Sequence, residues 1–117
     1  MIDPLSALSL YRQLEGLEET LKHAAGSPRD TFVNQFLSAL HSQDAFNHIL
    51  SEITEQCADS PQYLRSFSHI KPVNIPRGAD RSAYPRFFAQ VQMLKQAVRA
   101  LLELAFTPEE KQKIGFV

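Results

Sequence analysis

The stretch that decides the fold runs from Tyr84 to Phe106, YPRFFAQVQMLKQAVRALLELAF. Apolar residues recur along it in alternating steps of four and three, at Phe87, Val91, Leu94, Val98, Leu101 and Ala105, and Phe88, Leu102 and Phe106 widen the line. This is the period of an α-helix packed against other helices. Burying its large side chains would contribute roughly 1.5–3 kcal/mol each before entropy, so we expect the rest of the chain to cover this helix.

A second long helix is predicted for residues 4–25. Asp3 and Pro4 form a typical helix start, a capping carboxylate followed by proline at the first helical position. Leucines then repeat in steps of four and three, at Leu10, Leu14, Leu17 and Leu21. Gly26 is a typical C-terminal stop.

The middle of the chain carries two apolar faces that are out of phase by about a third of a turn. The first consists of Phe32, Val33, Phe36, Leu37 and Leu40, and the second of Phe46, Leu50, Ile53 and Cys57. The residues between them are His41-Ser42-Gln43-Asp44. We therefore expect a kink or break at residues 41–44, with Ser42 as a cap.

Two short helices are predicted where proline follows a capping residue, at about residues 61–67 and 108–114. Residues 69–82 contain Pro72, Pro76 and Gly78 and read as a long irregular segment, which Val73 and Ile75 would pin to the core. The predicted fold is a single all-α domain over residues 1–117. It is a small helical bundle of two long helices, a kinked or split middle helix pair and two short helices.

Composition limits the classes of protein to which the chain can belong. The apolar fraction of 44% and the charged fraction of 21% are ordinary for a globular protein, and the net charge of −1 argues against a strongly basic nucleic-acid binder. A single cysteine makes no internal disulfide. The N-terminus shows no signal-peptide pattern and no apolar run is long enough to span a bilayer, so we expect a cytoplasmic protein with no membrane partner.

Charge is distributed unevenly along the chain. Residues 1–59 carry three lysines and arginines against nine acids, whereas residues 60–117 carry nine against four. Either the two halves pair with one another, or the basic half offers a patch to an acidic partner. Basic and aromatic residues gather around the irregular segment, and the residues predicted to contact a partner are Arg65, Lys71, Arg77, Arg81, Tyr84 and Arg86.

No catalytic signature is visible, so the sequence predicts that the protein is not an enzyme. Serines and histidines stand outside any nucleophile motif, and the four glycines are scattered rather than grouped in a phosphate-binding loop. A stripe of possible metal ligands, His41, Asp44, His48, Glu52 and Glu55, lies opposite the second apolar face and is interpreted as a solvated helix surface. We expect no metal and no cofactor, and a buried, inert thiol at Cys57.

Two short resemblances point to known helical proteins. Residues 3–10, DPLSALSL, are similar to the opening of fungal helical domains at the front of NLR-like proteins. Residues 86–106 resemble, in composition and order, the long C-terminal helix of the TraM-type quorum-sensing antiactivators. Those are small all-α proteins that sequester a LuxR-type regulator, so the resemblance implies an inhibitor.

The function expected from these observations is binding. We expect a small soluble protein-interaction protein, an adaptor, chaperone or inhibitor of the antiactivator type, that contacts a protein partner through a helical face and residues 69–86. A homodimer through one apolar stripe is left open. The alternative is a nucleic-acid-associated protein using the basic segment, and an enzyme of unrecognised class is third.

Overall fold

Three long helices dominate the structure. The computed structural model describes residues 2–25, 31–75 and 83–116, and all regular secondary structure within these ranges is helical. The long helices are α1 (Pro4–Ala25), α2 (Thr31–Gln56) and α4 (Ala83–Ala105). The shorter elements are α3 (Pro61–Leu64), the 3-10 helix η1 (Arg65–Phe67) and α5 (Pro108–Lys113). The expected all-α bundle is therefore confirmed.

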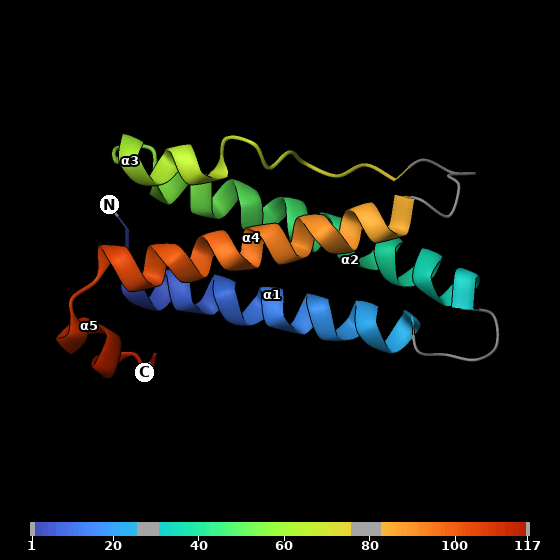
Figure 1. Ribbon diagram of the computed structural model, residues 1–117, viewed down its shortest axis with the longest axis horizontal. Coiled ribbons are helices and arrows are strands. Elements are labelled where there is room, and N and C mark those ends of the chain that lie inside the picture. Colours follow the sequence, from blue (N-terminus) through green and yellow to red (C-terminus); the bar gives the residue numbers. More distant parts are fainter. Residues whose placement is uncertain (1, 26–30, 76–82, 117) are drawn as a thin grey trace.

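The direction of the helices explains why one connection is long. In Figure 1, α1 runs antiparallel to both α2 and α4, so α2 and α4 point the same way. Parallel neighbours cannot be joined by a short turn, because the chain must first return along the length of the bundle. Residues 68–75, called the strap below, make the first part of this return beside α2 (Figure 1). The length of the strap is thus a consequence of the topology, because the connection must span the bundle before α4 can begin.

The buried line of α4 packs against both other long helices, as its periodicity predicts. Phe87, Val91, Leu94 and Val98 are at most 1% exposed. The Phe87 ring meets the ring of Phe46 on α2 edge-on, with centroids 5.6 Å apart. The described core also includes Ala7, Leu10, Tyr11, Leu14 and Leu21 from α1, Ile49, Leu50, Ile53 and Cys57 from α2 and its end, and Leu101, Leu102 and Phe106.

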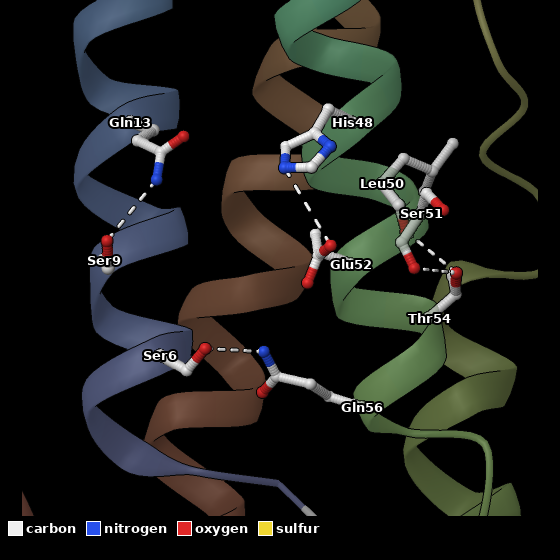
Figure 2. A network of polar contacts seen from close by, with 9 residues as sticks. All are labelled: Ser6, Ser9, Gln13, His48, Leu50, Ser51, Glu52, Thr54 and Gln56. Atoms are coloured by element: carbon white, nitrogen blue, oxygen red, sulfur yellow. Dashed lines mark hydrogen bonds and ion pairs between the residues drawn. The ribbon is translucent and has the colours of Figure 1, made fainter.

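The expected start and length of α1 are confirmed. Asp3 Oδ2 accepts a hydrogen bond from the backbone N–H of Ser6 at 3.2 Å, which satisfies a donor that the helix itself leaves free. The side chain of Ser6 also receives a hydrogen bond from Gln56 Nε2 at 2.8 Å. Figure 2 shows this contact joining the first turns of α1 to the last turn of α2.

Of the kink or break expected at residues 41–44, the break is wrong, because α2 continues without interruption from Thr31 to Gln56. The kink stays a prediction. Ser42 is 4% exposed and continues the buried line of Phe46, Ile49, Ile53 and Cys57 one turn further. A small polar residue on the buried line was therefore mistaken for a cap. The middle of the chain is therefore one continuous helix, and the bundle has three long helices.

The two short helical segments lie where the sequence predicts them. Residues 61–67 form α3 followed by η1, although Ser60 makes no side-chain cap and instead accepts backbone hydrogen bonds from Tyr63 and Leu64, both at 3.0 Å. At α5, Thr107 and Glu110 form the reciprocal capping box. Gly115 ends this segment with a φ of +78°, a conformation that favours glycine.

Candidate partner-binding surface

The residues predicted to contact a partner are spread along the return connection. Arg65 lies in η1, Lys71 in the strap and Arg86 in the first turn of α4, and all three are exposed. Arg77, Arg81 and the side chain of Tyr84 lie outside the described residues. Figure 1 shows α3 and the start of α4 toward opposite ends of the bundle. The structure therefore arranges Arg65, Lys71 and Arg86 along an edge and does not gather them in one cluster.

Two amide side chains of α2 hold the strap in an extended path. Asn47 Nδ2 donates to the carbonyl oxygen of Val73 at 2.7 Å, and the N–H of Val73 donates back to Asn47 Oδ1 at 2.7 Å. One turn earlier on α2, Gln43 Oε1 accepts a hydrogen bond from the N–H of Ile75 at 2.9 Å. Asn47 thus supplies both hydrogen bonds that a neighbouring strand would give to Val73.

The spacing of these contacts follows from the geometry of the two segments. Gln43 and Asn47 are four residues apart on a helix, a rise of about 6 Å, and Val73 and Ile75 are two residues apart in extended chain, about 6.6 Å. The two distances match, so two amide side chains one helical turn apart can each hydrogen-bond to the backbone of every second residue of the strap. The antiparallel order, Asn47 with Val73 and Gln43 with Ile75, agrees with the opposite directions of α2 and the strap in Figure 1.

Apolar anchors fix the inner side of the strap and leave its polar residues outside. Phe67, Ile70 and Ile75 are 2%, 4% and 6% exposed, and Val73 is half-buried against the core. The expected pinning by Val73 and Ile75 is therefore confirmed. The residues between the anchors are exposed: Ser68, His69, Lys71, Pro72 and Asn74.

The electrostatic character of this edge is positive. No acidic residue occurs between positions 60 and 79, and the described cations of this edge are Arg65, Lys71 and Arg86. Within the described part of the chain, the side chains of Arg65, Lys71 and Arg86 form no ion pair. These cations are available to a ligand or partner of opposite charge.

The two oppositely charged halves do meet, but at a different place. Glu18 on α1 is 8% exposed and lies 3.0 Å from Lys22 Nζ and 3.4 Å from Lys95 Nζ on α4. The hydrogen bond from Lys22 lowers the pKa of Glu18; burial opposes this shift and the charge of Lys95 adds to it. Glu18 in turn raises the pKa of Lys22. Charge complementation between the halves is thus seen at Lys95, away from the strap.

A groove that sequence reasoning missed lies between α1, α4 and α5. It encloses about 580 Å³, and Tyr11, Phe116, Arg12, Arg99, Glu103 and Lys111 are among its lining residues. A smaller hollow of about 240 Å³ adjoins it and shares Tyr11 and Arg99. The Phe116 ring meets the Tyr11 ring edge-on with centroids 6.0 Å apart, so the chain folds back onto α1 after Gly115. The sequence carries no signal that Phe116 would contact Tyr11, which lies 105 positions earlier.

Four of the five charged residues that line the groove, all except Glu109, already have a partner. Arg99 Nε lies 3.4 Å from Glu103 Oε1, and Arg12 pairs with Glu15 at 2.6 Å. Lys111 Nζ donates to the carbonyl oxygen of Glu103 at 3.4 Å. A ligand in the groove would therefore contact the aromatic rings of Tyr11 and Phe116 and would meet few unpaired charges.

The remaining polar clusters carry no sign of a metal site. Within residues 2–25, 31–75 and 83–116, no three side chains of His, Cys, Asp or Glu converge as metal ligands. His48 and Glu52 form a 3.9 Å pair on the outer side of α2, visible in Figure 2. Cys57 is fully buried, and burial raises the pKa of its thiol, as expected for an inert cysteine. No described helix combines the length and apolarity that crossing a bilayer needs.

Comparison with known proteins assigns the chain to no family. No protein-family model, curated protein or solved structure matches the chain. The similarity of residues 86–106 to the antiactivators therefore rests on their composition and order alone.

Proposed function

We propose that this chain is a small protein-interaction protein, an adaptor, chaperone or inhibitor, that binds an acidic surface of a partner protein along the edge formed by η1, the strap and the start of α4. The observation that carries the proposal is the clamped strap. Because Asn47 and Gln43 hold its backbone, Lys71 is presented at a fixed place without a cost in loop ordering on binding. A flexible loop of the same composition would bind more weakly.

The charge of the edge supports a partner of opposite sign. Arg65, Lys71 and Arg86 are exposed and free of ion pairs within the described residues, in a region nearly devoid of acids. Complementary charge steers association and selects partners. The overall charge of −1 favours such a local contact over binding to a long polyanion.

The test uses charge reversal at two described positions. Tagged wild type and the double variant Arg65→Glu/Lys71→Glu are used to capture proteins from the native host, with Lys113→Glu as the control because Lys113 is exposed on α5. We expect a protein that is retained by the wild type and the control and lost from the double variant. Identical proteins on all three would overturn the proposal.

Nucleic acid is the second candidate, and the run of seven cations against one acid over residues 60–102 favours testing it. Binding of a fluorescent single-stranded oligonucleotide is measured over a salt series for the same variants. A phosphate-binding surface predicts affinity that falls steeply with salt and falls again in the double variant. Unchanged binding in that variant would remove this candidate.

A further inference from the structure

The exposed side of α4 carries a line of residues that combines one cation with apolar side chains. Leu104 is 76% exposed and Met93 is 36% exposed, two of the three large exposed apolar residues of the described chain. Arg86 lies 18 positions before Leu104, five turns at about 3.6 residues per turn, so both lie on the same side of the helix. Met93, Ala97 and Ala100 lie within about 40° of that direction. We call Arg86, Met93, Ala97, Ala100 and Leu104 the outer face.

The other charged residues of α4 lie on the side toward α1. Lys95, Arg99 and Glu103 are turned from Leu104 by about 100–180° around the helix and line the hollows shared with α1. The outer face therefore has an apolar middle and one cation, Arg86, at its end. An apolar centre with charge at the rim is the composition of a protein interface.

The basic edge continues the outer face at its other end. The 3-10 helix η1 packs against α4, and Figure 1 shows α1 and η1 on opposite sides of α4. Because the outer face is the side of α4 turned away from α1, it adjoins η1. Arg65 of η1 lies toward the end of the bundle where α4 finishes, and Arg86 lies in the first turn of α4 at the opposite end. Unpaired cations thus lie toward both ends of the apolar line from Met93 to Leu104.

We propose that the outer face and the basic edge together bind one amphipathic α-helix of the partner protein, with an apolar line along one side and acidic residues beside that line. The inference rests on the proposed function and names the chemistry of its partner. The two alanines let the backbone of a helix approach α4 closely, while Met93 and Leu104 pack against its apolar line. Carboxylates beside the line would pair with Arg86 and Arg65. The outer face is about 27 Å long, so a partner helix of about five turns would cover it.

Charge and area favour this occupant over two others. The outer face of a second copy contains no acid, so it would leave Arg86 unpaired. A membrane surface takes up a helix with a broad apolar side that includes Trp, Phe or Leu, and here one leucine and one methionine are the large exposed residues. A helix with an acidic flank matches both the apolar and the cationic part of the surface.

Selection from a library of helical peptides tests the chemistry without knowledge of the partner. Peptides of about 20 residues, randomised on a helical host sequence and displayed on phage, are selected on the immobilised full chain. We expect enriched peptides that repeat apolar residues in steps of three and four and carry Asp or Glu beside that line. Enrichment of basic peptides, or no enrichment over an unrelated bait, would overturn the proposal.

Two matched pairs of variants locate the binding site of a selected peptide. Leu104→Gln is expected to weaken its binding about tenfold, whereas Leu5→Gln on α1, at a position 64% exposed, should bind like the wild type. Arg86→Glu should weaken binding, and Lys113→Glu on α5 should not. Circular dichroism confirms that each variant is folded. Equal affinities within either pair would place the peptide elsewhere on the molecule and overturn the proposal.

Capture from the native host separates this inference from the proposed function. A protein that is lost from Arg65→Glu/Lys71→Glu but retained by Leu104→Gln would support the proposed function and overturn the helix. Identical proteins on every variant, with selected peptides still bound at the outer face, would overturn the proposed function alone. A wild type of twice 13.2 kDa by light scattering that becomes monomeric in Leu104→Gln would place a second copy on the outer face and overturn the inference.

Discussion

At the scale of single residues, the side chain of Asn47 fixes the position of the strap with two hydrogen bonds. It meets the backbone of Val73 with both its donor and its acceptor, a pairing that only an amide side chain offers in this position. The contact bridges 26 positions of sequence. It converts an irregular segment into a fixed edge of the bundle.

Replacing Asn47 by alanine is expected to lower the free energy of unfolding by about 2 kcal/mol, because two hydrogen bonds are lost and the Val73 groups are left partly buried. Urea denaturation measures the effect. Asn74→Ala is the matched control, since Asn74 is an exposed asparagine of the same strap, and its effect should be within about 0.5 kcal/mol of zero. Equal losses in the two variants would contradict the clamp.

At the scale of elements, local signals predict helices well. The starts at Asp3 and Thr107, the stop at Gly115 and the buried line of α4 all follow from neighbouring residues, and the structure contains each of them. The missed features depend on distant residues. Ser42 was interpreted as a cap because its place on the buried line of α2 is not visible in the sequence. Gln43 and Asn47 look like surface amides until Ile75 and Val73 contact them.

The candidate site likewise has features that the sequence predicts and features that depend on tertiary contacts. Sequence composition identifies the basic segment, and its described cations are exposed, but how a partner would engage them stays a prediction. The groove beside Tyr11 could not be anticipated, because it forms only where the chain after α5 returns to α1.

The cap of α5 gives a prediction at this scale. Glu110 N–H donates to Thr107 Oγ1 at 3.2 Å and Thr107 N–H donates to Glu110 Oε1 at 3.0 Å, so Thr107→Ala removes half of the box and costs α5 about 1 kcal/mol. No residue of α5 is buried, so the loss should remain local. Hydrogen exchange is expected to quicken at the amides of α5 while the urea midpoint stays near that of the wild type. A midpoint that falls with the exchange would show that α5 unfolds together with the bundle.

At the scale of the whole molecule, one core joins the three long helices. The aromatic contact between Phe46 and Phe87 lies in this shared core, where α2 meets α4. Because α1 and the strap pack on the same cluster, a defect there should affect all elements at once.

Two neighbouring phenylalanines provide the matched comparison. Phe87 is 1% exposed and Phe88 is only half-buried. Phe87→Ala is expected to cost about 3–5 kcal/mol, and Phe88→Ala clearly less. Urea unfolding followed by circular dichroism should show a single transition for both variants. Similar costs, or two separate transitions, would contradict a common core centred on Phe87.

The positions of the two chain ends have a practical consequence. The start of α1 and the short helix α5 lie toward the same end of the bundle in Figure 1. An affinity handle or fluorescent reporter fused after the C-terminal residue would therefore crowd the hollow around Tyr11 and Phe116, whereas the opposite end of the bundle would stay unobstructed. Surface immobilisation through this end would orient every molecule alike, with the last turn of α1 and the first turn of α2 pointing into solution.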